Sequence, residues 1–399
     1  MTDIANAIAA LGDGPLCEES LRRHVFPLFS RVLARHEIYL ANHSLGRPLD
    51  QTAADVASGL DAWYGRMDDA WEDWMEAFEL FRRMTARLVG ARPDCIVPKA
   101  SAGQGLRTVL NSFHYPPRVV TTRAEFDSLD VILKQYQVKR RAEVVWVDTD
   151  DEGLIDPHKL VEALELGVDL LVVSQAFFST GQLLPRLADV IAAAHHYGAF
   201  VFLDCYHSYG VVPLDVMELG VDFAVAGSYK YLRGGPGACW LYLAPWVIDS
   251  GFTTLDTGWF AKKSPFSYQR PDPPVFAEGG DAFLESTFAV LPWLQARAGL
   301  ELTTEIGVGR LREYSLQQKR MMAKYLADHA LHCVGMGEEF GAFLRLPHPE
   351  AVAMAARLKA HGVNVDARSN GVRICPDLLN TEAEMAQAAS QIAELWHAR

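Results

Sequence analysis

The sequence predicts an α/β protein, with a mainly parallel sheet in a large domain and a smaller α+β domain at the C-terminal end. Three observations lead to this prediction. Short apolar runs alternate with amphipathic stretches between residues 96 and 242. Near-continuous apolar strands separated by helices are typical of a parallel sheet that is covered on both faces. The alternation of strands and helices resumes near residue 342, which indicates a second, smaller unit.

The first 52 residues are expected to form an N-terminal segment that packs with the small domain or with a partner. The stretch from residue 53 to residue 89 is typical of a helix, because aromatic side chains recur there at steps of three and four residues. We expect these aromatic side chains to lie in the core or at a dimer interface.

The large domain is expected to span residues 53–290. Its predicted strands are residues 118–122, 143–148, 168–174, 199–204, 223–227 and 239–243. Helices are predicted between them at residues 126–138, 157–165 and 186–197. Gly, Pro and aromatic residues are frequent over residues 249–289, which favours a long ordered loop region rather than a linker.

The small C-terminal domain is expected to span residues 291–399. Helices are predicted at residues 292–328, 349–360 and 381–395, and the runs AFLRLP and GVRICP are predicted strands. This pattern indicates an α+β unit that packs on the large domain.

Composition excludes several classes of protein. The chain has 399 residues, 50% of them hydrophobic, with 37 basic and 50 acidic side chains and a formal charge of -13, which argues against disorder and against broad nucleic-acid binding. No apolar run reaches the roughly 18 residues of a membrane helix, and the start lacks the basic region of a secretory signal. The six scattered cysteines contain no CxxC pair, so we expect free thiols, no metal site and a cytoplasmic location.

Three features at predicted strand ends carry chemistry. Asp204 ends one buried strand, Lys230 follows another, and the run PKASAGQGLRTVL opens a helix. Ligands of parallel sheets bind at the carboxyl ends of the strands. A lysine amine can bond to an aldehyde, an aspartate can keep a pyridine nitrogen protonated, and a helix start can hold a phosphate. Each feature alone is weak, but together they indicate pyridoxal 5'-phosphate.

The run GSYKYLRGGPGACWLYL closely resembles the Schiff-base lysine motif of kynureninases, within the class V aminotransferase group of fold-type I enzymes. Further local matches occur in the same order along most of the chain, in IYLANHSLGRP, SQAFFSTGQLLP, TGWF and NGVRICPDLLNTEAE. The resemblance implies the fold-type I PLP-dependent transferase fold, pyridoxal phosphate as cofactor, and a homodimer with shared active sites.

The resemblance also implies roles for individual residues. Lys230 would bond to the cofactor aldehyde, Asp204 would pair with the pyridine nitrogen, and Arg373 would clamp the substrate α-carboxylate. Phe126 would stack on the cofactor ring, with Ser128 nearby, and Ser174 would contact the cofactor at a further position. The implied contacts with the phosphate are Ser101, Ala102, Gly103, His207 and Tyr229. Trp259 and Thr287 would reach the phosphate of the neighbouring subunit.

Ordinary structural roles stay open for several of these residues. Phe126 could be a core residue, His207 a structural histidine and Trp259 an interface residue. Arg373 could form a surface ion pair of little energetic value, and Arg368 competes with it for the carboxylate.

The chain departs from the kynureninase pattern at several positions, among them the FDSL run, where the acid Asp130 is displaced by one residue. Kynureninases carry a histidine and an asparagine, which contact the aromatic amine of kynurenine, where this chain has Lys262 and Thr287.

Cysteine desulfurases need a reactive thiol just before the arginine, and the run ARSNGV before Arg373 has no cysteine. Cys375 and Cys333 lie in apolar runs, where a thiol is a poor nucleophile.

The sequence therefore predicts a PLP-dependent enzyme that acts on an α-amino acid as a small-molecule substrate, with no nucleic-acid or membrane partner. A kynureninase-like hydrolase that cleaves a Cβ–Cγ bond and releases alanine is favoured, and a class V aminotransferase is the alternative. A cysteine desulfurase and a non-catalytic PLP-binding protein are disfavoured. A Rossmann dehydrogenase is excluded by the missing GxGxxG motif.

Overall fold

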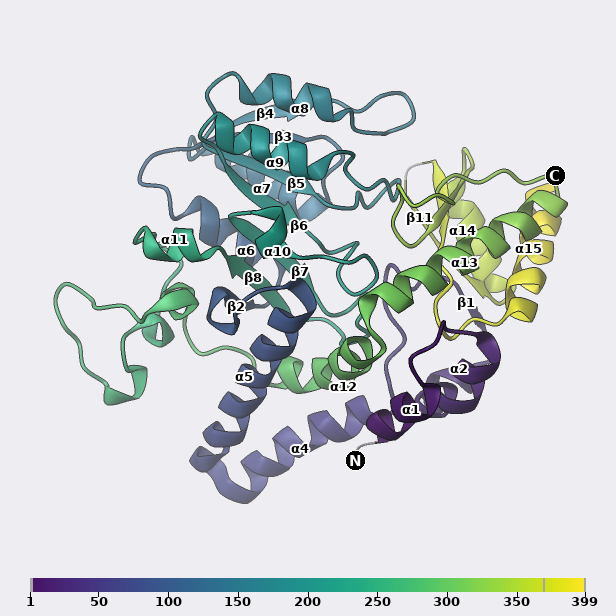
Figure 1. The fold of residues 1–399 in the computed structure, drawn as a ribbon, viewed down its shortest axis with the longest axis horizontal. Helices are drawn as coiled ribbons and strands as arrows, with labels where there is room; N and C mark the ends of the chain where they lie inside the picture. The colour runs from purple at the N-terminus through teal and green to yellow at the C-terminus, as the bar shows by residue number, and fades with distance from the viewer. Residues whose placement is uncertain (1–2, 369, 398–399) are drawn as a thin grey trace.

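A seven-stranded sheet forms the centre of the computed structural model, which describes residues 3–368 and 370–397 (Figure 1). Its strand order is β2-β8-β7-β6-β5-β3-β4. The five strands from β3 to β7 run parallel, whereas β8 is antiparallel to both β7 and β2. The strands are β2 (Ile96–Lys99), β3 (Arg118–Thr122), β4 (Glu143–Val147), β5 (Leu170–Ser174), β6 (Phe200–Asp204), β7 (Phe223–Gly227) and β8 (Cys239–Leu243).

The predicted strands of the large unit are confirmed to within two residues. Every residue of β5, β7 and β8 is buried, as expected for strands that are covered on both faces. Helices α6 and α7 pack against each other, as do α8 and α9, and the two pairs cover opposite faces of the sheet (Figure 1). These helices are α6 (Ala102–Leu110), α7 (Asp127–Val138), α8 (Pro157–Leu164) and α9 (Leu187–His196), and two shorter ones are α10 (Val216–Leu219) and α11 (Pro245–Asp249).

The region around residues 250–290 is a long loop that extends from the body of the molecule, as predicted (Figure 1). Its regular structure is confined to short 3-10 helices. These are η4 (Trp259–Ala261), η5 (Pro265–Ser267) and η6 (Gly279–Phe283).

The single helix predicted over residues 53–89 is wrong, because two helices occupy this stretch. α4 (Gln51–Arg66) and α5 (Ala70–Val89) form a hairpin, with the 3-10 turn η2 (Met67–Asp69) between them. Met67 has a backbone φ of 51°, which ends α4 because the left-handed region cannot continue a right-handed helix. α4 and α5 both pack against α12 (Leu291–Ile306).

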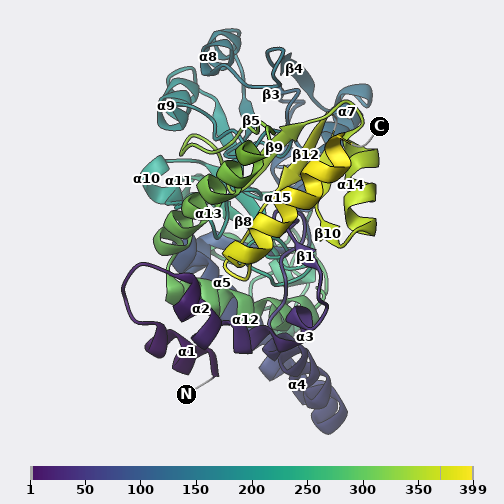
Figure 2. The same ribbon diagram turned by 90° about the vertical axis from the view of Figure 1, so that its right-hand side faces the viewer.

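The C-terminal unit is an α+β structure, as predicted. A three-stranded antiparallel sheet has the order β11-β12-β9, and Figure 2 shows α13, α15 and α14 side by side in front of β9 and β12. The elements are α13 (Val308–Asp328), β9 (Leu344–Pro347), α14 (Ala351–Ala360), β10 (Val363–Asn364), β11 (Asp366–Arg368), β12 (Gly371–Ile374) and α15 (Glu382–His397).

The N-terminal segment connects the two units. Its short strand β1 (Ile38–Tyr39) pairs in parallel with β10 of the C-terminal unit. Its apolar side chains form a separate core with α12, α13 and the residues that follow β12. The remaining helical elements are α1 (Asp3–Leu11), α2 (Glu18–His24), η1 (Phe26–Phe29), α3 (Ser30–Leu33) and η3 (Pro93–Cys95).

The domain boundaries at residues 52 and 290 remain proposals. Side chains of α12 contribute both to the core of the large sheet and to the N-terminal core, so α12 belongs as much to the large unit as to the small one. Among the described residues, no helix has both the length and the apolar character that crossing a bilayer requires.

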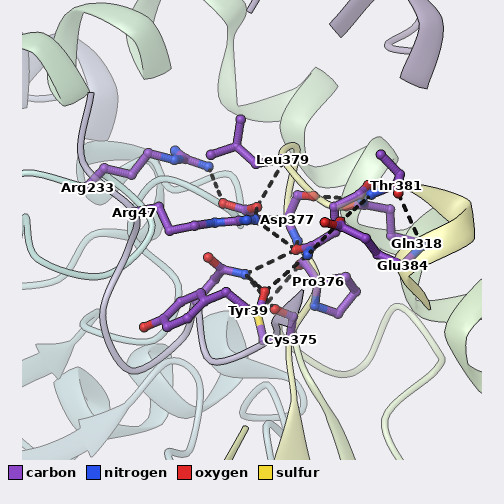
Figure 3. A network of polar contacts seen from close by, with 12 residues as sticks. Tyr39, Arg47, Arg233, Gln318, Cys375, Pro376, Asp377, Leu379, Thr381 and Glu384 are labelled. Carbon is purple, nitrogen blue, oxygen red and sulfur yellow. Dashed lines mark hydrogen bonds and ion pairs between the residues drawn. The ribbon is translucent and has the colours of Figure 1, made fainter. Parts of the chain in front are cut away.

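A buried polar network lies where the three parts of the chain meet (Figure 3). Arg47 of the N-terminal segment and Arg233 of the loop after Lys230 both point toward the carboxylate of Asp377. The Arg233 Nη2 to Asp377 Oδ2 distance is 3.0 Å, and Gln318 on α13 donates to the Asp377 carbonyl at 2.7 Å. Burial alone would raise the pKa of Asp377, but the two guanidinium groups hold it below its usual range. This network therefore ties the lysine loop to the C-terminal unit.

Candidate active site

The carboxyl edge of the large sheet gathers the polar residues that the sequence singled out. Ser174 ends β5 and Asp204 ends β6, and the two residues are paired in register. β7 ends at Gly227, three residues before Lys230. All three side chains are buried, and Lys230 is only 5% exposed. Lys230 is therefore not a surface lysine.

The Lys230 amine lies in an enclosed, largely aromatic environment. Its Nζ is 2.5 Å from Nε2 of His207 and 5.6 Å from the ring centroids of Phe126, Tyr206 and Tyr229. Burial lowers the pKa of Lys230 to about 7, although the nearby Asp204 carboxylate acts in the opposite direction. Much of the amine is thus unprotonated near neutral pH, which is the form that attacks an aldehyde.

Asp204 presents one carboxylate oxygen to the site. Its Oδ1 accepts a hydrogen bond from the Tyr206 amide at 2.8 Å, whereas its Oδ2 has no hydrogen-bond partner among the described residues. Burial raises the pKa of Asp204 to about 6, against the effects of that amide and of Lys230. The Oδ2 atom of Asp204 can therefore accept a hydrogen bond from a protonated ring nitrogen.

The N-terminus of α6 lies at the same edge of the sheet. β8 is antiparallel to both neighbours, so β2 runs parallel to β7, and Lys99 and Gly227 face the same residue of β8. Ser101 caps α6, its Oγ accepting from the Gln104 amide at 3.2 Å. The amides of Ala102 and Gly103 have no hydrogen-bond partner among the described residues. This helix start can therefore hold an anion such as a phosphate.

Arg373 lies on β12 and faces this site from the C-terminal unit. Its guanidinium donates from Nε to Asp366 Oδ1 at 2.7 Å, from Nη2 to Asp366 Oδ2 at 2.5 Å, and from Nη1 to the carbonyl of Phe178. These contacts use three of the five N–H groups of an arginine, and the other two can bind a substrate carboxylate. Because Arg373 is 2% exposed, the alternative of a surface ion pair is wrong.

Arg368, the competing arginine, is half exposed and lies farther from the shared carboxylate. Its Nη1 is 3.8 Å from Asp366 Oδ2, and 43% of its side chain is accessible to solvent. Arg373 is therefore the better candidate for carboxylate binding.

Several predicted site residues have contacts other than those that the resemblance implies. Ser174 Oγ donates to the buried carboxyl group of Glu125 at 2.5 Å. His207 meets the Lys230 amine, so its predicted contact with the phosphate stays a prediction. Ser128 is half-buried in the first turn of α7, two residues after Phe126.

Trp259 and Thr287 contact each other in the extended loop region. The indole Nε1 of Trp259 donates to Thr287 Oγ1 at 3.0 Å, and Thr287 is exposed. Lys262 donates to the carbonyl of Gln269 at 2.9 Å within the same loop. None of these hydrogen bonds involves Lys230, so the predicted cofactor contacts of Trp259 and Thr287 stay predictions.

Two buried residues were missed in the sequence. Glu125 accepts hydrogen bonds from Ser174 and Thr122, and burial raises its pKa to about 8. His43, in the N-terminal run NHSLG, is bonded to Asp366 at 2.9 Å. Glu125 directly precedes Phe126 in the sequence, and only this position next to a predicted cofactor contact could have indicated its role.

The observed groups fit pyridoxal phosphate. Lys230 can bond to its aldehyde, the free oxygen of Asp204 can meet its ring nitrogen, and the start of α6 can hold its phosphate. The buried Nδ1 of His207 also has no partner within the described residues, so a polar group of a ligand can satisfy it. Fold and site thus define an α/β enzyme of the lysine- and aspartate-based pyridoxal phosphate class.

Comparison with known proteins agrees with this class. The model of the family "Aminotransferase class-V" matches residues 59–337. A kynureninase from Bacillus anthracis is 29% identical over 375 residues, covering 88% of this chain and 86% of the relative. A kynureninase from Geobacillus thermodenitrificans is 27% identical over 400 residues, covering 94% and 92%.

Solved structures of other enzymes share the fold. A mutant of the cystine C-S lyase C-DES, with glycine linked to its PLP cofactor, superimposes with a TM-score of 0.83 at 18% identity and covers 92% of this chain and 98% of its own. The cysteine desulfurase CsdA from Escherichia coli gives a TM-score of 0.79 at 17% identity, covering 96% and 99%.

The chain belongs to the class V aminotransferase family, because the family model matches well over half of its length. It is a PLP-dependent enzyme, and within this family it is a kynureninase-like member. The predicted fold class is confirmed.

Proposed function

We propose that this enzyme is a hydrolase of the kynureninase type, which cleaves the Cβ–Cγ bond of an α-amino acid and releases alanine. One observation carries the proposal: a buried lysine interacts electrostatically with a buried aspartate and a buried arginine, in a chain similar to curated kynureninases over 88% of its length. Reaction type diverges readily on a shared fold, so the proposal needs a direct assay.

We assign the following roles to the residues. Lys230 holds the cofactor through its amine and afterwards moves the proton of the substrate α-carbon. Asp204 keeps a proton on the ring nitrogen, and Arg373 holds the α-carboxylate so that the Cα–H bond faces the lysine. When bound, pyridoxal phosphate supplies an aldehyde and an electron-accepting ring. The aromatic rings around Lys230 exclude water from the amine.

We propose the remaining cofactor contacts at the same site. The start of α6, at Ser101, Ala102 and Gly103, would bind the phosphate, and Phe126 would stack on the ring. Ser128, Ser174, His207 and Tyr229 would complete the pocket within the chain.

A desulfurase function is not proposed, because the thiols of Cys375 and Cys333 are poor nucleophiles. Cys375 is fully buried and donates to the carbonyl of Ala342 at 3.2 Å, and burial raises its pKa well above the usual range. Burial also raises the pKa of Cys333 to about 11. A thiol that stays protonated does not attack sulfur.

The proposed function predicts that the enzyme releases alanine from kynurenine or 3-hydroxykynurenine without added keto acid. Alanine and the aromatic amino product are measured by chromatography, with the Lys230→Ala variant as the control. Amino transfer to an added keto acid without release of alanine would instead support the aminotransferase alternative and reject the hydrolase.

We further propose that the enzyme is a homodimer with shared active sites. Trp259 and Thr287 belong to the long loop region, where Thr287 is exposed and Trp259 is partly buried, with its indole N–H on the Thr287 hydroxyl. Apolar side chains at the end of α4 are also exposed: Trp63 by 52%, Tyr64 by 83% and Met67 by 64%. A surface of this kind favours association.

Shared sites predict complementation between two inactive variants. Lys230→Ala removes the lysine of its own site, and Thr287→Glu places a negative charge beside the partner's phosphate. Co-expressed, the two variants should regain about a quarter of wild-type activity, since half of randomly formed dimers hold one intact site. Recovery is measured on the purified mixture, and none is expected if Thr287 acts within its own chain.

The six cysteines are free, which agrees with a reducing compartment, and we propose the cytoplasm.

A further inference from the structure

A chain of buried polar contacts ends on the proposed carboxylate-binding arginine. Nε2 of His43 is 2.9 Å from Oδ1 of Asp366, and Asp366 receives two N–H groups of Arg373. The His43 side chain is fully buried, and only 17% of the Asp366 side chain is accessible. His43, Asp366 and Arg373 lie on three different segments of the polypeptide, so these contacts are part of the tertiary structure.

The backbone fixes where His43 lies. The Cys375 amide, two residues after Arg373, donates to the Leu40 carbonyl at 2.7 Å, and the side-chain amide of Asn42 donates to the Cys375 carbonyl at 2.8 Å. The N-terminal segment is therefore fastened alongside the end of β12. The ring of His43 packs at 4.8 Å from the ring of Phe343, and the Arg373 guanidinium lies 5.4 Å from the same ring.

The direction of the hydrogen bond from His43 is determined. Burial and the nearby Arg373 guanidinium lower the pKa of His43 to about 4, so the ring is neutral. Burial would raise the pKa of Asp366, but its contacts with His43 and Arg373 hold it well below the usual range, so this carboxylate only accepts. The single ring proton of His43 therefore sits on Nε2 and points at Asp366. His43 adds a hydrogen bond without adding positive charge.

Asp366 has a competing partner. Arg368 lies 3.8 Å from its Oδ2, at the more exposed side of the site. The hydrogen bond from His43 to Oδ1 holds the carboxylate in the orientation that engages both Nε and Nη2 of Arg373. Without it, the carboxylate is free to turn toward Arg368, and the Arg373 guanidinium is held less firmly, by the carbonyl of Phe178 and a weakened contact with Asp366.

We propose that His43 is a positioning residue for substrate binding, which acts through Asp366 to orient Arg373 toward the α-carboxylate of the amino acid. The inference rests on the proposed role of Arg373 and extends it to a residue of the N-terminal segment.

The test measures binding of L-alanine and of L-alaninamide, in which the carboxylate is replaced by a neutral amide. Both are titrated into the cofactor-loaded enzyme and followed by the visible absorbance of the cofactor. His43→Phe keeps the ring on Phe343 but removes the donor, so it should weaken alanine binding about tenfold, the effect of losing one hydrogen bond to a charged group, and leave alaninamide within about twofold. His43→Gln restores an N–H donor and should recover alanine binding to within about threefold of wild type.

Two comparisons separate positioning from general damage. In an Arg373→Gln background, His43→Phe should change alanine binding by less than about twofold, because coupled residues are not additive. His195→Phe is the matched control: it breaks a His–Asp contact of the same 2.9 Å length, to Asp222, away from the site, and should leave both affinities unchanged.

Several results would overturn the inference. His43→Phe could weaken alanine and alaninamide equally, or its effect could persist in full beside Arg373→Gln. If Arg373→Gln itself does not discriminate between the two ligands, the proposed role of Arg373 fails and this inference fails with it. If Arg373→Gln discriminates and His43→Phe does not, only the inference fails. Should His43→Phe not fold, Asp366→Asn must show the same selective loss.

Discussion

At the scale of single residues, burial moves the proton affinities of the groups at the sheet edge in directions that suit their roles. The pKa of Lys230 falls to about 7, which supplies an unprotonated amine near neutral pH. Glu125 has the opposite character, because burial raises its pKa to about 8 despite hydrogen bonds from Ser174 and Thr122. Glu125 is therefore protonated at neutral pH and leaves Asp204 as the charged carboxylate of this edge.

Glu125 should make the free energy of unfolding fall as the pH rises. Between its ordinary pKa of 4.5 and about 8, the folded protein holds a proton that the unfolded chain releases, so stability is lost through this window. Glu125→Gln cannot ionise, and its stability should decline less steeply between about pH 5 and pH 8. Urea unfolding at several pH values measures both slopes. Asp204 and Lys230 titrate in both proteins, so their contributions cancel when the two slopes are compared. Equal slopes for wild type and Glu125→Gln would contradict the raised pKa of Glu125.

The residues that sequence could predict are those that follow directly from strand ends. Lys230 and Asp204 were found because each follows a buried apolar run, and both lie at the expected edge of the sheet. His43 and Asp366 could not be found in this way. They lie 323 positions apart in the sequence, and only the tertiary structure brings them into contact.

At the scale of elements, hydrophobic pattern was sufficient for the parallel strands but not for the breaks between helices. The apolar runs from β3 to β8 are short and separated by polar or turn-forming residues, and they were predicted closely. The α4–α5 hairpin was missed because the aromatic periodicity continues across the turn at Met67, although Gly65 and the Asp68–Asp69 pair beside it are weak signals of a break. β2 was missed because it is short and contains Pro98, which usually argues against a strand interior.

Close packing of the N-terminal loop on the lysine loop makes Gly46 critical. Its amide donates to the carbonyl of Tyr229 at 2.8 Å, and a Cβ at this position would lie 1.9 Å from the backbone oxygen of Lys230. Gly46→Ala should therefore lower the free energy of unfolding by about 1–3 kcal/mol, as overpacking does, and should reduce cofactor affinity by displacing Lys230.

Gly65, in α4, is the matched control for this substitution, because a Cβ there meets nothing within 4 Å. Gly65→Ala should stabilise the protein by up to about 1 kcal/mol through helix propensity and leave cofactor affinity unchanged. Thermal unfolding and cofactor titration measure both effects. A Gly46→Ala protein as stable and as tightly loaded as wild type would contradict the observed packing.

At the scale of the whole molecule, the candidate site is assembled from three separate parts of the chain. The sheet edge supplies Lys230 and Asp204, the C-terminal unit supplies Arg373, and the N-terminal segment supplies His43. The Asp377 network in Figure 3 holds the same three parts together through Arg47 and Arg233. The order of helices and strands along the chain was enough to predict the fold. The contacts that join the sheet edge, the C-terminal unit and the N-terminal segment depend on buried ion pairs, which the hydrophobic pattern of the sequence does not reveal.

The central claim is that Lys230 is the residue that bonds to pyridoxal phosphate. Two other buried lysines are internal controls, because Lys99 is held by Glu285 and the carbonyl of Phe283, and Lys319 donates to backbone carbonyls that include those of Gly335 and Gly341. Neither amine is free to react, although burial lowers the pKa of Lys319 to about 7 as well.

Borohydride reduction of the cofactor-loaded protein, followed by peptide mass spectrometry, tests this claim most directly. We predict one pyridoxyl group per chain, on the peptide that contains Lys230, and none in Lys230→Ala. A pyridoxyl group on Lys99, Lys319 or another lysine, or an unlabelled Lys230 in protein that retains the cofactor, would contradict the account.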